Sequence, residues 1–400
     1  MRFKKCLVAV TILVTAIIII SLFVPKPSSL TLEFPKIQDE KKAIFVSYIE
    51  YQDYIKNQDI RTAKANLITM LDNMEKLGFN MIIAHVRSFS DAVYPSKLFP
   101  SSEVIVNKEG DELLFDILEF IIKEAHLRHI EIHAWINPYR IRNSTNIDSI
   151  SKNNPCYKWL GSNKLKVIPN KGIFYNPASR EVRTLVLEGI KEILDNYEVD
   201  GIHFDDYFYP DHEIDRDNYA SYINEGGKLS LTDYRLEEVN KLVRATYELV
   251  HSYNKIFGIS PEGNIDNNYA SNYADTKRWM GEKGYIDYIM PQIYFGFLNE
   301  RKPFLKTILE WNSYIKLDDI KLLPALAFYK TGSKDNYAVS GSTEWQDNQN
   351  IIMKQVIASR GVSHYMGFSL FRYDYIFGDR YKTETTMKET EELLKLLIHS

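Results

Sequence analysis

The sequence predicts an α/β protein, a (β/α)₈ TIM barrel preceded by an N-terminal transmembrane signal anchor. Residues 41–400 alternate short apolar strands with amphipathic helices, and eight such pairs follow one another. This alternation is typical of a parallel barrel with right-handed crossovers. The first strand is followed by Tyr48, Ile49 and Glu50, so it lacks the glycine-rich phosphate loop of an open doubly wound sheet. A long apolar run near the N-terminus predicts the anchor.

Each strand is predicted from a short apolar run, and each helix from apolar residues that recur at helical spacing. The strands are expected at residues 43–49, 80–86, 130–136, 201–205, 256–260, 286–293, 321–328 and 362–370. The helices are expected at residues 62–77, 113–128, 181–196, 236–253, 273–281, 304–315, 346–359 and 386–398. Gly78 ends the first helix as a C-terminal cap. Residues 140–178 carry Asn, Pro, Gly and aromatic residues and are expected to form a long loop.

The N-terminal 25 residues are expected to anchor the protein in a membrane. Arg2, Lys4 and Lys5 precede an apolar run at residues 6–24, which is long enough to span a bilayer. The basic residues would stay in the cytoplasm, which places the rest of the chain outside. The run is long and no small-x-small cleavage site follows it, so an uncleaved anchor is favoured over a cleaved signal peptide. Residues 26–40 form a linker, and residues 41–400 form the domain.

Composition excludes some classes of function. The net charge of -4 gives no electrostatic basis for binding nucleic acid. Cys6 lies in the predicted anchor, which leaves the outer domain with Cys156 alone. The domain therefore forms no internal disulfide and depends on its hydrophobic core. The composition does not indicate an oligomeric state.

Polar residues gather where the predicted strands end, which is where barrel enzymes build their sites. The residues singled out as candidates are His85, Arg87, Trp135, Asn137, His203, Asp205, Asp206, Tyr207, Glu262, Gln292, Tyr294 and Arg372. His85 and Arg87 are two apart, and this spacing predicts that they share one face of a strand. Asp205 is the strongest candidate, because an unpaired buried carboxylate is costly.

Structural roles compete with functional ones for several of these residues. His85, His133 and His203 could be core histidines that hydrogen-bond to loop carbonyls, and Trp135 could be a core residue. Arg87 could pair with a carboxylate, and Arg372 could pair with Asp374. The sequence contains no His-Glu-x-x-His pattern and no basic phosphate clamp near the two aspartates, so no metal or cofactor is predicted.

Five segments, residues 84–94, 133–140, 200–210, 290–294 and 367–373, together make the chain resemble glycosyl-hydrolase-like family 10 of bacterial envelope proteins. The resemblance implies a (β/α)₈ barrel and a glycoside hydrolase, and some members act on peptidoglycan glycan strands stripped of peptides. One departure is Glu262 in Ser-Pro-Glu-Gly, where the family often has Phe. A comparison with family 18 chitinases is also informative, because their catalytic Glu corresponds to Tyr207 here.

Glycoside cleavage usually needs two carboxyl groups, one to protonate the leaving oxygen and one to attack or to activate water. We expect Asp205 to be the nucleophile or charge stabiliser and Glu262 to be the general acid, with Asp206 as the substitute acid. Adjacent side chains on a strand point in opposite directions, so Asp205 and Asp206 cooperate only if the backbone turns there. His85, Arg87, Asn137, His203, Gln292, Tyr294 and Arg372 would hold the sugar, and Trp135 and Tyr207 would stack on it.

The predicted protein is thus a hydrolase of a cell-wall polysaccharide, attached to the membrane and located outside the cytoplasm. A non-catalytic glycan-binding module on a degenerate barrel is the alternative. An enzyme directed at uronates or dependent on a metal comes third.

Overall fold

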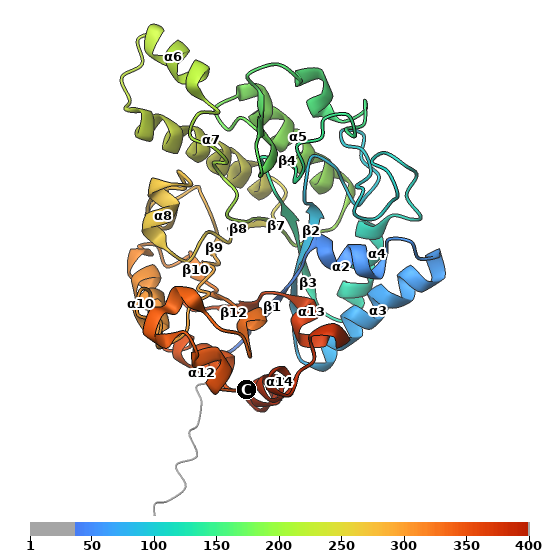
Figure 1. Ribbon diagram of the computed structural model, residues 1–400, viewed down its shortest axis with the longest axis vertical. Helices are drawn as coiled ribbons and strands as arrows, with labels where there is room; N and C mark the ends of the chain where they lie inside the picture. Colours follow the sequence, from blue (N-terminus) through green and yellow to red (C-terminus); the bar gives the residue numbers. More distant parts are fainter. Residues whose placement is uncertain (1–36, 399–400) are drawn as a thin grey trace, which may run out of the picture. The chain divides into compact units, whose positions relative to one another are not determined.

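The computed structural model describes residues 37–398, which contain a nine-stranded parallel sheet surrounded by helices (Figure 1). The strands follow the order β10-β9-β8-β7-β3-β2-β1-β12-β11. Their bounds are β1 (Lys41–Val46), β2 (Met81–Arg87), β3 (Glu131–Ile136), β7 (Gly201–Phe204), β8 (Ile256–Ile259), β9 (Tyr288–Ile289), β10 (Lys321–Leu322), β11 (Ala325–Leu326) and β12 (Gly367–Leu370). The predicted α/β class and parallel pairing are therefore confirmed.

The sheet curls round so that its two end strands are neighbouring pieces of one segment. Only Leu323 and Pro324 separate β10 from β11. The Leu323 N–H donates to the carbonyl of Ile289 at 2.9 Å, and the Ser369 N–H donates to the carbonyl of Pro324 at 3.0 Å. Pro324 has no N–H to donate, which explains the break in the strand. This arrangement is consistent with the predicted (β/α)₈ barrel.

Helices follow the strands along the chain, and their apolar faces are buried. They are α3 (Ile60–Lys76), α4 (Ile117–Leu127), α5 (Arg180–Asn196), α7 (Leu231–His251), α9 (Thr276–Gly281), α10 (Phe304–Tyr314), α12 (Ile351–Ser359) and α14 (Glu384–Ile398). Several begin at a side chain that caps free backbone N–H groups. Asp59 accepts from the N–H groups of Arg61 and Thr62, Ser179 from Val182, and Ser230 from Asp233. These helices match the predicted ones to within a few residues.

Three regions differ from the prediction. The first strand ends at Val46, because Ser47 and Glu50 form a capping box that starts α2 (Tyr48–Tyr54). Residues 140–178, predicted as a loop, contain a three-stranded antiparallel sheet of β4 (Arg140–Arg142), β6 (Gly172–Tyr175) and β5 (Leu165–Ile168). The predicted helix at 346–359 is divided into α11 (Glu344–Asp347) and α12. Short helices also occur at α6 (Arg216–Asn224), α8 (Ile265–Ala270) and α13 (Tyr373–Phe377).

The predicted anchor, and all but the last four residues of the predicted linker, lie outside the described residues. Within residues 37–398, no helix is both long enough and apolar enough to cross a bilayer.

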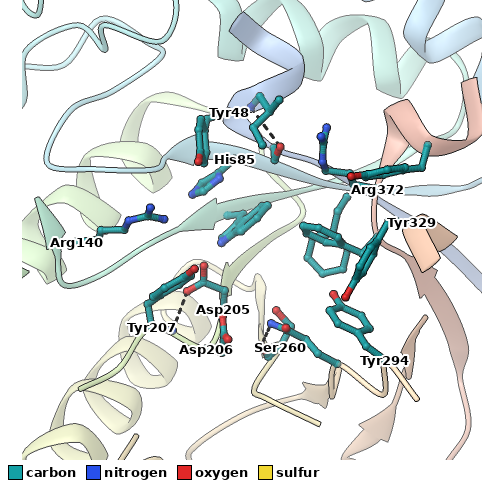
Figure 2. A pocket seen from close by; sticks show the side chains of 17 residues that line it. Tyr48, His85, Arg140, Asp205, Asp206, Tyr207, Ser260, Tyr294, Tyr329 and Arg372 are labelled. Atoms are coloured by element: carbon teal, nitrogen blue, oxygen red, sulfur yellow. Dashed lines mark hydrogen bonds between the residues drawn. The ribbon is translucent and has the colours of Figure 1, made fainter. Parts of the chain in front are cut away.

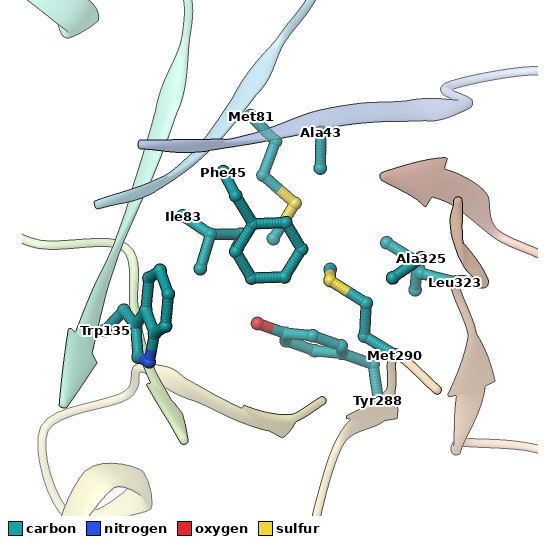
Figure 3. Packing of buried hydrophobic residues seen from close by; sticks show 9 residues of the cluster. All are labelled: Ala43, Phe45, Met81, Ile83, Trp135, Tyr288, Met290, Leu323 and Ala325. Atoms are coloured by element: carbon teal, nitrogen blue, oxygen red, sulfur yellow. The ribbon is translucent and has the colours of Figure 1, made fainter. Parts of the chain in front are cut away.

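The barrel interior is filled by side chains from strands all around the ring (Figure 3). At its centre lies the Tyr288 hydroxyl, 2.8 Å from His133 Nδ1 and 2.9 Å from His203 Nδ1. His203 Nε2 lies 2.8 Å from Ser260 Oγ. Burial lowers the pKa of His133 to about 3 and that of His203 well below its usual value, so both rings are neutral.

The hydrogen-bond partners assign the tautomers of both rings. Ser260 Oγ donates to the Phe204 carbonyl at 3.4 Å, so it accepts from His203 Nε2–H. His203 Nδ1 then accepts from the Tyr288 hydroxyl, whose oxygen accepts from His133 Nδ1–H. In this arrangement every N–H and O–H of the network has an acceptor. The network therefore ties together side chains of β3, β7 and β9 and the residue that follows β8.

Two glycines make room for these rings. A Cβ on Gly258 would lie 2.0 Å from the Tyr288 ring, and a Cβ on Gly201 would lie 2.7 Å from the His133 ring. Neither ring has a flexible end that could move aside. The aromatic layer thus requires glycine on the neighbouring strands.

We expect Gly258→Ala to lower the free energy of unfolding by about 1–3 kcal/mol, because the added methyl group overpacks the interior. Gly281→Ala is the matched control, since its Cβ would meet only Lys316 Cγ at 3.9 Å. Urea unfolding of both variants measures the difference. Equal stability of the two variants would contradict the proposed packing.

Candidate active site

A cavity of about 390 Å³ opens at the carboxyl ends of the strands (Figure 2). Its lining includes eight of the residues singled out from the sequence. They are His85, Trp135, Asp205, Asp206, Tyr207, Gln292, Tyr294 and Arg372. The lining also includes residues that the sequence reasoning missed, among them Tyr48, Arg140, Ser260, Tyr329 and Tyr375. The fold therefore brings most of the predicted residues around one space.

Asp205 and Asp206 both line this cavity although they are adjacent in sequence. Strand β7 ends at Phe204, and the backbone turns directly after it. The Tyr207 N–H donates to Asp205 Oδ1 at 3.2 Å, and the Phe208 N–H donates to the Asp206 carbonyl at 3.1 Å. Because the backbone turns here, the two adjacent carboxyl groups face the same cavity and can cooperate.

The environment of the pair favours protonation. Burial raises the pKa of Asp205 to about 8, and the neighbouring charge of Asp206 adds to this rise. Burial also raises the pKa of Asp206 to about 6, and the charge of Glu262 contributes. Asn137 lies behind the pair, where its Nδ2 donates to Asp205 Oδ2 at 3.1 Å. It therefore supports Asp205 and does not line the cavity.

The aromatic rings of His85 and Trp135 form the part of the cavity wall that comes from β2 and β3, and β3 is the neighbour of β7. His85 and Trp135 stack with their ring centroids 3.6 Å apart. Among the described residues, no group bonds to either ring nitrogen of His85 or to Nε1 of Trp135. Burial lowers the pKa of His85 well below its usual value, so its ring is neutral and offers one donor and one acceptor. All three nitrogen atoms are themselves buried, so the stacked pair presents mainly ring surface to the cavity.

Arg372 reaches the cavity from the end of β12 and is held there by Glu50. The Arg372 guanidinium bonds to Glu50 Oε1, and Ser47 Oγ donates to Glu50 Oε2 at 2.6 Å. Asp374 lies farther away, at 3.8 Å from Arg372. The pairing with Asp374 considered from the sequence is thus secondary to the pairing with Glu50. The Ser-x-x-Glu spacing at residues 47–50 is the sequence signal that was overlooked.

Arg87 lies away from the cavity, so the predicted shared face of His85 and Arg87 is wrong. The register of β2 against β3 shifts between these two residues, and such a bulge changes the face to which the following side chain points. Arg87 packs over the Phe99 ring at 4.0 Å. A Cβ on Gly189 of α5 would collide with its guanidinium, which places Arg87 on the outer side of the sheet.

His203 also lies outside the cavity lining, in the buried network with Tyr288 and Ser260. It is 0% exposed and both of its ring nitrogens are bonded. It therefore has no atom left for a sugar. The two-residue spacing to Asp205 places both on the interior face of β7, but His203 lies one layer deeper in the barrel.

Glu262 lines an adjoining cavity of about 410 Å³. Its carboxylate accepts from Asn267 Nδ2 at 2.9 Å. The two cavities share Arg140, Asp206 and Tyr207 as lining residues. Asp206 thus lies where the cavities meet, while Glu262 belongs to the second cavity alone.

No set of three or more His, Cys, Asp or Glu side chains within residues 37–398 has the geometry to hold a metal ion.

Comparisons with known proteins agree with this picture. Residues 40–342 match the model of the family described as Glycosyl hydrolase-like 10. Glycosyl hydrolase YngK of Bacillus subtilis is 30% identical over 82% of this chain and 68% of its own length. Glycosyl hydrolase DigH of Escherichia coli K12 is 29% identical over 79% of this chain and 77% of its own length.

A solved structure shares the fold. The glycoside hydrolase domain of PgaB (BpsB) from Bordetella bronchiseptica aligns with a TM-score of 0.61, over 88% of this chain and 99% of that one. The sequence identity is 11%, so this likeness concerns the fold alone.

We expect Asp206→Asn to lower the pKa of Asp205, because the substitution removes a neighbouring negative charge. Burial should keep that pKa above the ordinary value for Asp. Glu262→Gln is the matched control, since it should lower the pKa of Asp206 and leave that of Asp205 nearly unchanged. Carbon-13 NMR of labelled aspartate carboxyl groups measures both values. An unchanged Asp205 pKa in Asp206→Asn would contradict the coupling.

Proposed function

The chain belongs to the glycosyl hydrolase-like 10 family and is a glycoside hydrolase, and from this premise we propose that Asp205 and Asp206 catalyse cleavage of a bacterial cell-wall polysaccharide. The observation that carries the proposal is the carboxyl pair itself. Both groups end the same strand, line one cavity and have raised pKa values. Perturbed carboxyl groups in a cleft are typical of acid–base catalysis.

The pair supplies the two functions that hydrolysis needs. The raised pKa values, about 6 and about 8, let the pair carry one proton and one negative charge near neutral pH. The protonated carboxyl donates to the leaving glycosidic oxygen. The ionised one stabilises the positive charge that develops on the sugar, as nucleophile or as counter-charge.

Asp206 replaces Glu262 as the proposed partner of Asp205. Asp206 shares the cavity with Asp205, whereas Glu262 lies in the adjoining cavity. Burial raises the pKa of Asp205 further than that of Asp206, so Asp205 holds the proton near neutral pH and Asp206 is the ionised member, which reverses the roles expected from the sequence. We assign Glu262 to binding the sugar on the far side of the cleavage point.

The substrate we propose is the glycan strand of peptidoglycan. The two cavities meet at Asp206, so a polymer lying across both would place one glycosidic bond at the carboxyl pair. His85 and Trp135 line the cavity with their stacked rings, and Tyr207, which is 48% exposed, offers a stacking face for a sugar. A location outside the cytoplasm, with residues 1–25 as membrane anchor, belongs to the same proposal.

Incubation of the protein with peptide-free peptidoglycan strands, followed by mass spectrometry of released fragments, tests this function. We expect soluble oligosaccharides to appear. Binding without release, on these strands and on a broad panel of other polysaccharides, would contradict catalysis and would favour a glycan-binding module.

We expect Asp205→Asn and Asp206→Asn each to reduce kcat by about 10²–10⁴-fold, because each removes half of the acid–base pair. Glu262→Gln should lower kcat by less than about tenfold and act mainly on KM, since it removes uniform binding. Asp205→Asn, which lacks the proton donor, should recover activity on an aryl glycoside, because an acidic leaving group departs without being protonated. Full activity of a folded Asp205→Asn variant would rule out the assignment.

Activity should follow a bell-shaped pH profile, because only the singly protonated pair is competent. Below about pH 6 both carboxyl groups are protonated, and above about pH 8 neither is. In Asp206→Asn the residual activity should lose this bell shape. A wild-type profile that is flat from pH 5 to pH 9, a range chosen to span both values by about one unit, would contradict the shared proton.

A further inference from the structure

Arg140 lies at the junction of the two cavities and has no ion-pair partner among residues 37–398. It is half-buried, and within residues 37–398 its guanidinium forms no ion pair or hydrogen bond. It lies between two aromatic rings instead, 4.9 Å from the centroid of Phe89 and 4.9 Å from that of Tyr207. Figure 2 shows it reaching from the side of the cavity toward His85 and Asp205.

Several buried arginines of this fold are paired with carboxylates. Arg142 pairs with Glu109 at 2.8 Å, Arg235 with Asp215 at 2.8 Å, and Arg360 with Glu40 at 2.7 Å. Such pairing is expected, because a charge withdrawn from water is costly without a partner. Arg87, over Phe99, lies outside both cavities. Arg140 is therefore distinguished by being unpaired and open to a ligand.

Arg140 does not act as a fixed counterion of the catalytic pair. Its positive charge lowers the pKa of Asp205 and of Asp206, yet burial dominates and both values remain raised. No ion pair joins it to either aspartate in the described part of the chain. The guanidinium thus keeps its donors available while lying near the reacting centre.

The backbone of Arg140 is held rigidly. Arg140 begins β4 and pairs with Phe174 of β6. The Tyr175 N–H donates to the carbonyl of the preceding Tyr139 at 2.8 Å. A side chain presented from a strand and stacked between rings loses little freedom when it binds, which favours specific recognition. Lys171 adds a second positive charge to the wall of the adjoining cavity.

We propose that Arg140 binds a carboxylate carried by a sugar of the substrate, and this inference rests on the proposed glycan substrate. The planar guanidinium matches a carboxylate with two parallel hydrogen bonds. A singly charged carboxylate fits better than a phosphate monoester, which carries up to two negative charges, because Asp205 and Asp206 lie nearby and repel added negative charge. The carboxylate could belong to a hexuronic acid or to the lactyl ether of N-acetylmuramic acid.

Matched oligosaccharides test the proposal. Two series are needed, one with hexuronic acid and one with N-acetylmuramic acid, each with its carboxyl groups free or reduced to alcohols. Calorimetric binding is measured on the full-length protein carrying Asp205→Asn, so that the ligand is not cleaved. We expect the free acid of one series to bind about 10–100-fold more tightly than its reduced form, as for a hydrogen-bonded charge.

Arg140→Gln should abolish this preference and leave affinity for the reduced ligand nearly unchanged. Arg216→Gln is the control, because it removes the same charge from a side chain that is 81% exposed on α6. The series that shows the preference identifies the source of the carboxylate. An equal loss of affinity for free and reduced ligands in Arg140→Gln would indicate a packing role for Arg140 and overturn the proposal.

The same ligands separate this inference from the proposed function. Cleavage of free and reduced glycans at equal rates by the wild-type protein would overturn carboxylate recognition and leave hydrolysis intact. Carboxylate-dependent binding that requires Arg140, without cleavage by the wild-type protein, would support the inference and contradict the proposed catalysis. Failure of both series to bind would overturn the inference.

Discussion

The hydrogen bonds of the Tyr288 hydroxyl to His133 and His203 are the interaction on which the rest of the site depends. A buried polar group is costly unless it is hydrogen-bonded. One hydroxyl satisfies two histidines from neighbouring strands, and Gly201 and Gly258 leave space for the rings. The network fixes the relative positions of these strands. It therefore also fixes where the residues that follow the strands enter the cavity.

Asp205 and Asp206, the pair proposed to be catalytic, follow directly above this layer. His203 and Asp205 lie on the same face of β7, so the ring that bonds to Tyr288 also sets the position of the carboxyl group. The backbone turn after Phe204 then brings Asp206 beside Asp205. Both groups are held where burial opposes their ionisation, which costs stability and makes proton transfer possible near neutral pH.

Much of the fold could be predicted from the sequence, because strand–helix alternation and buried strands leave clear periodic patterns. The convergence of strand ends predicted that Asp205, Asp206, Trp135 and Gln292 would meet around one space. The β2 bulge could not be predicted, since one extra residue leaves no trace in the pattern of apolar residues; Arg87 was misplaced for this reason. The apolar pattern also does not show how deep in the barrel a residue of a strand lies. The sequence therefore predicts His203 as a site residue, although it lies below the cavity.

Arg140 shows a different limit. It is the last residue of segment 133–140, which carries the family resemblance, whereas the sequence predicts a loop over residues 140–178. Short antiparallel strands in a polar, aromatic-rich segment carry weak signals, because their pairing partners are distant in sequence. What makes Arg140 notable is a missing partner, and the absence of an ion pair is visible only in three dimensions.

The most direct test of the account is a crystal structure of the Asp205→Asn variant bound to a peptidoglycan-derived oligosaccharide. The account predicts sugars in both cavities, with one glycosidic oxygen within hydrogen-bond reach of the carboxyl pair, at about 2.6–3.2 Å. An oligosaccharide bound elsewhere on the protein, or bound in the cavities with every glycosidic oxygen beyond reach of residues 205 and 206, would contradict it.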